Sequence, residues 1–211
     1  MRKIVSLLLS FGMIFTLAAC GQSAASEKQA EIEMETETSE SVSTEEQEAD
    51  VSTKTLVVYF SCTGTTELVA EYITEILGAD SYQIVPENPY TEADLAYYTN
   101  GRADQEQDDP DARPAISGGV ANMDAYDTII LGFPIWHGQA PRIISTFLES
   151  YDFSGKTIVP FCTSHSSGVG SSADNLHSLC AESVEWRDGK RFESGVSKES
   201  VQKWIEEIGI E

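Results

Sequence analysis

The chain has 211 residues, a formal net charge of −22 at pH 7 and four cysteines. This length suits one domain of ordinary size better than two small ones. So large an acidic excess argues against a nucleic acid as partner, because nucleic-acid binding requires basic patches on the protein. The cysteines have neither CxxC nor zinc-finger spacing, so we predict no metal site.

The first residues have the build of a secretion signal. Arg2 and Lys3 precede an apolar run from about Ile4 to Ala19, and Cys20 follows. The "LAAC" stretch resembles a bacterial lipobox, which implies a signal peptide over residues 1–19, cleavage before Cys20 and a lipid on its thiol. A transmembrane anchor is the alternative, but the run is shorter than the roughly 20 residues that a spanning helix needs. We therefore expect a protein outside the cytoplasm, anchored by its lipid to the bacterial cell membrane.

The segment after Cys20 is polar throughout. Up to residue 53 it repeats Glu, Ser and Thr, with one lysine and no aromatic residue. Such a segment cannot bury enough apolar surface to fold. We expect residues 20–53 to form a disordered tether and residues 54–211 to form the folded domain. The three cysteines of that domain lie where disulfides persist, and their odd number leaves at least one unpaired.

Within the domain, apolar runs of strand length alternate with helical periodicity. The run "TLVVYF" (55–60) predicts a strand covered on both faces. Apolar residues then recur at helical spacing from Leu68 to Leu77, and Gly78 is a natural stop. Further strands are predicted over residues 81–86, 126–134 and 156–164, and further helices over 141–150, 172–180 and 197–208. This alternation predicts an α/β fold with a parallel sheet and helices on both faces.

Two stretches fit this alternation less regularly. The stretch "SVEWRDGKRF" predicts the edge strand, either single or as a hairpin around "DG". The polar segment 87–117 predicts one helix near residues 92–99 followed by loop.

Three loops follow the central strands and meet beyond their carboxyl ends, where open α/β sheets bind ligands. The first, "SCTGTT" (61–66), joins a buried strand to a helix N-terminus, whose free amides and partial positive charge attract an anion. Its hydroxyls add donors, and Gly64 lets the backbone come close to the ligand. We therefore expect a compact phosphate, because the loop lacks the lysine of a Walker motif, the G-x-G-x-x-G of dinucleotide sites and the arginine of cysteine phosphatases. An ordinary capped helix is the alternative.

The second and third loops indicate a flat heterocycle. In "PIWHGQAP", Trp136 follows a buried strand and would be exposed unless something planar lay against it. Core packing is the alternative for this indole. In "CTSHSSGVGSS", hydroxyls and backbone amides suit the polar edge of a ring. Together the loops describe a site for a mononucleotide with a flat base.

These motifs carry a family resemblance. The stretch "LVVYFSCTGTTELVAEYI" is similar to the flavodoxin signature [ST]-x-T-G-x-T, and the two later loops resemble the loops of that family that contact the flavin. The resemblance covers residues 54 to the C-terminus and is closest to lipoprotein-attached flavodoxin-like proteins of bacteria. It implies a doubly wound, five-stranded parallel sheet of order 2-1-3-4-5 and FMN as cofactor.

The resemblance also implies the cofactor-binding residues. Those of the first loop hold the phosphate, with Cys62 contacting it through its backbone only: Ser61, Cys62, Thr63, Gly64, Thr65 and Thr66. Those of the second loop lie along the isoalloxazine, with Trp136 stacked on it: Pro134, Ile135, Trp136, His137 and Gly138. Those of the third contact its pyrimidine edge: Thr163, Ser164, His165 and Gly168. His165 stands where glycine is more usual.

As function we expect one-electron transfer between redox partner proteins with basic docking surfaces, with no catalytic side chain, because the flavin carries the chemistry. One rival is a flavin-dependent quinone or NAD(P)H oxidoreductase, in which segment 87–117 shapes a substrate pocket with Tyr97, Tyr98 and Arg113 as contacts. A second rival is a surface binding module with a vestigial flavin site. A hydrolase is the weakest reading, because the sequence has no G-x-S-x-G motif.

Overall fold

The computed structural model of the chain describes residues 54–210, apart from the side chains of Ser171 and Ala173. The predicted signal peptide, Cys20 and tether lie outside these residues, and what was expected of them stays a prediction. Within the described range, no helix combines the length and the apolar character needed to cross a bilayer.

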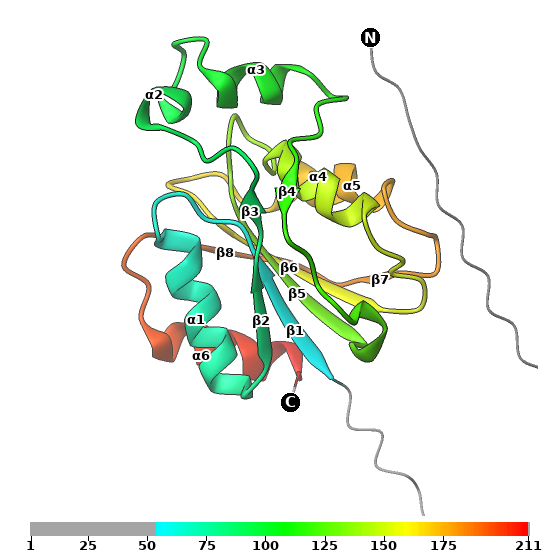
Figure 1. The fold of residues 1–211 in the computed structure, drawn as a ribbon. Helices are drawn as coiled ribbons and strands as arrows, with labels where there is room; N and C mark the ends of the chain where they lie inside the picture. The colour runs from blue at the N-terminus through cyan, green and yellow to red at the C-terminus, as the bar shows by residue number, and fades with distance from the viewer. Residues whose placement is uncertain (1–53, 211) are drawn as a thin grey trace, which may run out of the picture. The chain divides into compact units, whose positions relative to one another are not determined.

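The main sheet is parallel throughout (Figure 1). Its strands run in the order β2 (Asp80–Gln83), β1 (Thr55–Tyr59), β5 (Thr128–Pro134), β6 (Thr157–Thr163), and then β7 (Glu185–Trp186) and β8 (Lys190–Phe192) along the outer side of β6. β7 and β8 both pair with β6 and together take the place of one edge strand. Counted along the chain, the five positions of the sheet then have the order 2-1-3-4-5, and the predicted order is confirmed.

Helices cover both faces of this sheet, as predicted. On one face, α1 (Thr65–Leu77) and α6 (Lys198–Ile208) bury residues such as Ile73 and Trp204 against Val57 and Val159. On the other face lie α4 (Arg142–Glu149) and α5 (Gly170–His177). The central strands are buried on both faces of the sheet, so both sets of their alternating side chains are apolar. For this reason the strands were predicted from continuous apolar runs in the sequence and not from alternation of polar and apolar residues.

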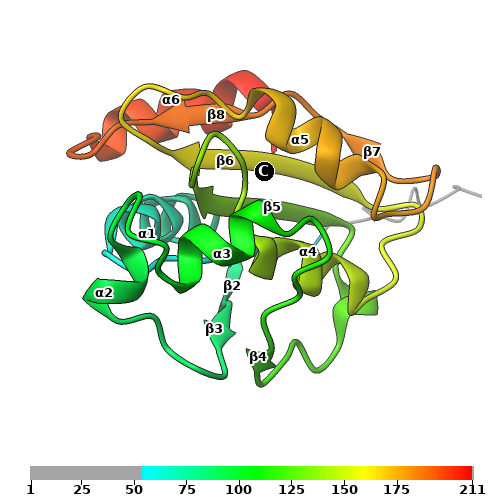
Figure 2. The same cartoon turned by 90° about the horizontal axis from the view of Figure 1, so that it is seen from above.

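The segment between β2 and β5 is more ordered than predicted. The helix expected near 92–99 is confined to α2 (Glu92–Leu95), and the expected loop contains α3 (Arg102–Asp108). A second, antiparallel sheet of β3 (Val85–Pro86) and β4 (Ile116–Ser117) closes its base, and a 3-10 turn (Met123–Ala125) precedes β5. In Figure 1 the α2–α3 unit lies beyond the carboxyl ends of the strands, and Figure 2 shows α3 between α1 and α4.

The edge strand is not a hairpin. Both β7 and β8 pair with β6 in parallel, Ile158 opposite Trp186 and Phe161 opposite Lys190, so the edge strand contains one residue more than β6 between these pairs. The ladder breaks where Pro160 faces the edge, because proline has no N–H to donate. The "DG" dipeptide therefore spans a bulge within one edge strand rather than a reversal of the chain.

Gly132, at the centre of the sheet, offers a test of core packing. A Cβ at this position would lie 2.1 Å from Cζ of Phe161, its register partner, whose ring is fully buried. We expect Gly132→Ala to lower the free energy of unfolding by about 1–3 kcal/mol, the usual cost of overpacking, in a urea titration of the domain. Gly168→Ala is the control, because a Cβ there meets nothing within 4 Å. Equal stability of the two variants would contradict this packing.

Candidate functional site

The three predicted loops converge on one pocket of about 770 Å³ at the carboxyl edge of the sheet. It is lined by most of the predicted cofactor residues: Ser61, Cys62, Thr63, Thr65, Thr66, Pro134, Ile135, Trp136, His137, Gly138, Thr163, Ser164 and His165. Gly64 instead lines a smaller, adjoining hollow at the start of α1, and Gly168 lines neither. The structure thus brings together residues that lie more than a hundred positions apart in the chain.

Other lining residues were missed by the motif analysis. The α2–α3 unit contributes Leu95, Tyr97, Tyr98, Ala103 and Asp104, and the segment after β8 contributes Glu193 and Ser194. Tyr97 and Tyr98 had been considered only for the oxidoreductase rival, and its third candidate, Arg113, instead pairs with Glu149 at 2.6 Å. One feature of the sequence could have predicted that the α2–α3 unit lines the pocket. The unit follows the parallel strand β2, so its segment leaves the sheet at the carboxyl edge, where the ligand site lies.

The first loop is shaped to present its backbone. Gly64 is the N-cap of α1 and has a left-handed conformation (φ +82°), which a residue with a Cβ adopts only with strain. Ser61 Oγ accepts a hydrogen bond from the Gly64 N–H at 3.1 Å, which closes the loop on itself. The following N–H groups belong to the first turn of the helix, where no carbonyl lies one turn earlier to accept from them. The loop therefore offers amides and hydroxyls to an anion, as the FMN phosphate would require.

A pair of hydroxyls ties this loop to the third one. Thr66 and Thr163 are both buried, and their Oγ1 atoms lie 2.7 Å apart in a hydrogen bond. Thr66 is in the first turn of α1 and Thr163 is the last residue of β6. The bond therefore fixes the spacing between the predicted phosphate end of the pocket and the loop predicted for the pyrimidine edge.

Trp136 lies in the pocket wall but is not the exposed indole that the sequence suggested. Only 8% of its surface is accessible, because it packs edge-on against Phe60 and Tyr90, with ring centroids 5.5 and 5.2 Å away. The premise of an otherwise exposed indole was wrong, since these two partners, distant in sequence, cover it. Its contact with a flavin stays a prediction.

The loop that carries Trp136 ends in a tight turn. Trp136 and Gln139 exchange both backbone hydrogen bonds, at 2.8 and 2.9 Å, around His137 (φ +49°) and Gly138 (φ +79°). Two successive positive φ angles are the mark of a type I′ turn, and they are costly for a residue such as histidine. His137 holds this conformation with its Nε2 2.7 Å from Oδ1 of Asp104, on α3.

Exposed aromatic rings lie on the α2–α3 side of the pocket. Tyr97 and Tyr98 are 54% and 87% accessible, and their ring centroids lie 5.1 and 5.5 Å from that of His137. Among the described residues, these two are the large apolar side chains most exposed at the pocket. They give it an aromatic wall that does not depend on Trp136.

The third loop is supported from the edge strand. Arg191, in β8, donates from Nη1 to the carbonyl oxygens of Ser164 and His165, both at 3.3 Å, and Ser164 Oγ donates to the carbonyl of Ser167. These bonds fold the loop back beside the pocket. His165 remains an exposed side chain on its rim.

The thiols of the domain are free and poorly ionised. Cys62, Cys162 and Cys180 form no disulfide within the described residues. Loss of hydration raises the pKa of Cys62 to about 11 and that of the buried Cys162 to about 12. With its pKa raised, the Cys62 thiol contributes to the pocket near pH 7 as a neutral group.

Comparison with known proteins identifies the class. The model of the flavodoxin family matches residues 54–208. Crystal structures of candidate flavoproteins from Bacteroides eggerthii and Bacteroides uniformis are similar to this chain, with 40% and 42% identity, each at a TM-score of 0.69. The matches cover 75% and 73% of this chain and 99% and 98% of theirs. Among curated proteins, none matches significantly.

A third structure shares the fold at greater distance. A flavoprotein of Lactobacillus acidophilus, crystallised in complex with FMN, is 24% identical, with a TM-score of 0.55, over 72% of this chain and 98% of its own. The parallel sheet, the pocket at its carboxyl edge and these similarities define a flavodoxin-like α/β protein. The chain belongs to the flavodoxin family.

The hydroxyl pair predicts a measurable coupling. Thr66→Val leaves the buried Thr163 hydroxyl without its partner, so we expect a loss of about 1–3 kcal/mol in the free energy of unfolding. Thr66→Val combined with Thr163→Val should cost clearly less than the sum of the two single changes, since neither hydroxyl is then left over. Thr63→Val, at an exposed hydroxyl, is the control, with an expected change within about 0.5 kcal/mol. Strictly additive losses in urea titrations would refute the coupling.

Proposed function

We propose that this domain binds FMN in the pocket and serves as an electron-transfer protein outside the cytoplasm. The observation that carries the proposal is the meeting, in one pocket, of a phosphate-binding helix N-terminus, an aromatic wall and a polar third loop, in a chain of the flavodoxin family. Bound FMN supplies chemistry that accepts and donates one or two electrons.

Different parts of the pocket are assigned to different parts of FMN. The amides of the first turn of α1, with Ser61, Thr63 and Thr65, would hold the phosphate, and Gly64 would permit the close approach of the backbone. The turn at His137 and Gly138, with Tyr97 and Tyr98, would contact the ring system. Ser164, Ser166 and Ser167 offer donors and acceptors to the polar edge of the ring.

The surroundings of the pocket make added negative charge unfavourable. None of the lining residues is a lysine or arginine, and the lining carboxylates of Asp104 and Glu193 are paired with His137 and Arg191. The chain as a whole is strongly acidic. The negative field of the protein would disfavour additional electrons on the flavin ring and so lower its reduction potential. The same field would steer partner proteins with basic docking surfaces toward the domain.

The visible spectrum of the purified domain tests this function. Residues 54–211, mixed with FMN, should show a perturbed flavin spectrum and quenched flavin fluorescence, and reductive titration should proceed in two separable one-electron steps. A single two-electron step would argue against a one-electron carrier. Protein that takes up no FMN would favour a binding module with a vestigial site.

A flavin-dependent oxidoreductase is the second candidate, and one observation favours it. Tyr97, Tyr98 and Leu95 place a wall of side chains from the α2–α3 unit around the pocket, as a planar substrate would require. Steady-state oxidation of NADH or NADPH by the FMN-loaded domain, with and without a quinone, separates the two candidates, since a carrier alone shows no sustained turnover.

The location is proposed from the N-terminal sequence. If Cys20 carries the lipid, Cys20→Ser should abolish incorporation of a labelled fatty acid, because the acylated thiol is removed. Cys62→Ser is the matched control and should leave incorporation unchanged. A wild-type protein that incorporates no labelled fatty acid and keeps residues 1–19, as its mass would show, would instead support an uncleaved transmembrane anchor.

A further inference from the structure

We propose that α3 is a clamp on the flavin-facing loop, and that Asp104 and Gln107 are positioning residues that set the conformation of residues 134–141. The inference rests on the proposed function, since it assigns these residues a role toward FMN that they exert through the loop. Neither belongs to the three motif loops, and Gln107 does not line the pocket.

Gln107 joins both arms of the loop at once. Its side chain is 6% accessible, and its Nε2 donates to the carbonyls of Trp136 at 3.1 Å and Ala140 at 3.3 Å. Its Oε1 accepts from the backbone N–H of Arg142, the first residue of α4, at 3.1 Å. One buried amide thus bonds three backbone groups on the two sides of the His137 turn. The Trp136 carbonyl also accepts from the Gln139 N–H, so the groups that depend on Gln107 for a side-chain partner are the Ala140 carbonyl and the Arg142 N–H.

Asp104 holds the tip of the same turn. Its Oδ1 contacts His137 Nε2 at 2.7 Å, and its Oδ2 accepts from the backbone N–H groups of Thr99 and Asn100, both at 2.9 Å. Burial alone would raise the pKa of this carboxyl, but the bonds from His137 and from those amides hold it below its usual value. The carboxylate therefore links the strained His137 (φ +49°) to the chain reversal at Asn100 (φ +59°).

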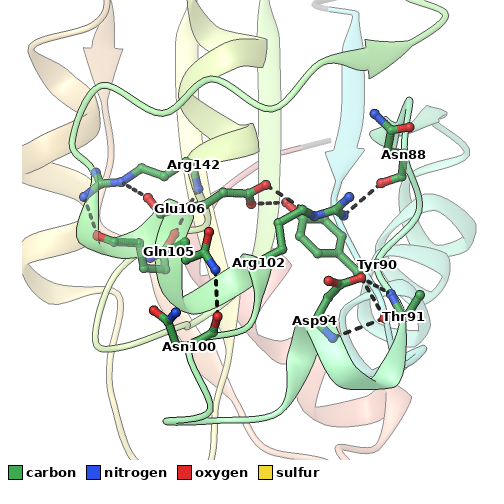
Figure 3. Close-up of polar contacts among 10 residues, drawn as sticks. Asn88, Tyr90, Thr91, Asp94, Asn100, Arg102, Gln105, Glu106 and Arg142 are labelled. Atoms are coloured by element: carbon green, nitrogen blue, oxygen red, sulfur yellow. Dashed lines mark hydrogen bonds and ion pairs between the residues drawn. The ribbon is translucent and has the colours of Figure 1, made fainter.

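The clamp is itself anchored, as Figure 3 shows. Arg142 donates from its guanidinium to the carbonyls of Glu106 at 3.3 Å and Gln107 at 3.0 Å, and Glu106 accepts from the Tyr90 hydroxyl at 2.5 Å. Arg102 lies over the Tyr90 ring at 3.8 Å and donates to the carbonyl of Asn88 at 2.8 Å. These contacts hold α3 at its first residue, Arg102, and near its last residues, Glu106 and Gln107. Because the helix is held independently of the His137 turn, it can set the position of the loop.

The consequence concerns where the loop stands relative to the flavin. Gln107 fixes the carbonyls of Trp136 and Ala140, and Asp104 fixes the ring of His137, so the peptide between His137 and Gly138 is held at the tip of the turn on the pocket wall. Reduction adds electrons and protons to the ring system and none to the phosphate, so a displaced peptide beside the ring would affect the oxidised and reduced cofactor unequally. The clamp therefore acts on the reduction potential as well as on affinity.

The first test needs no cofactor. In Gln107→Leu and Asp104→Ala proteins, hydrogen–deuterium exchange of the peptide that covers residues 134–142 should accelerate about tenfold or more, as expected when one or more local hydrogen bonds are lost. Gln105→Ala is the matched control, because Gln105 is exposed on the same helix and its side chain donates to the Asn100 carbonyl and not to the loop at 134–141. Exchange in Gln107→Leu equal to that in Gln105→Ala would overturn the clamp, whether or not the wild-type domain binds FMN.

The second test separates positioning from structural support. The Kd for oxidised FMN should rise about tenfold in Gln107→Leu, and the midpoint potential of the bound flavin should move, because the two redox states are weakened unequally. Equal weakening of both states leaves the potential at its wild-type value and would show that Gln107 is merely structural. Asp104→Asn retains one acceptor oxygen for the Thr99 and Asn100 amides and places an NH2 group toward His137 Nε2, so it should restore most of what Asp104→Ala loses. If Gln107→Leu does not fold, the comparison of Asp104→Ala with Asp104→Asn serves as the test. Wild-type values of both exchange and potential in Asp104→Ala would refute the role of Asp104.

Discussion

Parallel pairing of β1, β5 and β6 is the constraint on which the site depends. Tyr59 stands opposite Gly132, and Pro134 opposite Thr163, so the chain leaves all three strands at the same edge of the sheet. Since the strands are buried on both faces, a shift in register would move apolar side chains out of two cores at once. The loops are short and begin at these fixed points, and the hydroxyl pair of Thr66 and Thr163 adds a direct link between two of them. The pocket is thus a consequence of the sheet.

The α2–α3 unit adds to this common scaffold what the sheet does not specify. Its helices are short and largely polar, and a helix such as α3 would not be stable by itself. It is held by bonds to other elements: Gln107 and Asp104 to the loop after β5, and Arg142 to its last carbonyls. Its stability and its effect on the pocket therefore come from the same contacts, and a change in one is expected to appear in the other.

The sequence predicted what local pattern encodes. The central strands and the helices α1, α4 and α6 follow from apolar runs and helical spacing, and Gly64 and Gly78 mark the two ends of α1. The outcomes that differed depend on distant partners. Trp136 is covered by Phe60 and Tyr90, α3 has no apolar period to reveal it, and the edge strand bulges because Pro160 faces it from β6. Phe60 and Tyr90 lie far from Trp136 in the chain, and Pro160 lies far from the edge strand. Patterns within a short stretch of sequence therefore cannot reveal these contacts.

A cradle of amides and hydroxyls has a physical advantage in a chain this acidic. A lysine or arginine at the phosphate would be drawn toward the surrounding carboxylates, such as Glu67 in the first turn of α1, and would lose part of its effect on the ligand. Backbone dipoles cannot be drawn away, because the helix holds them in place. A cradle of this kind binds the phosphate without bringing a full positive charge near the ring. For the proposed carrier, such a cradle would supply affinity at the phosphate without offsetting the effect of the acidic surroundings, which would keep the reduction potential of the ring low.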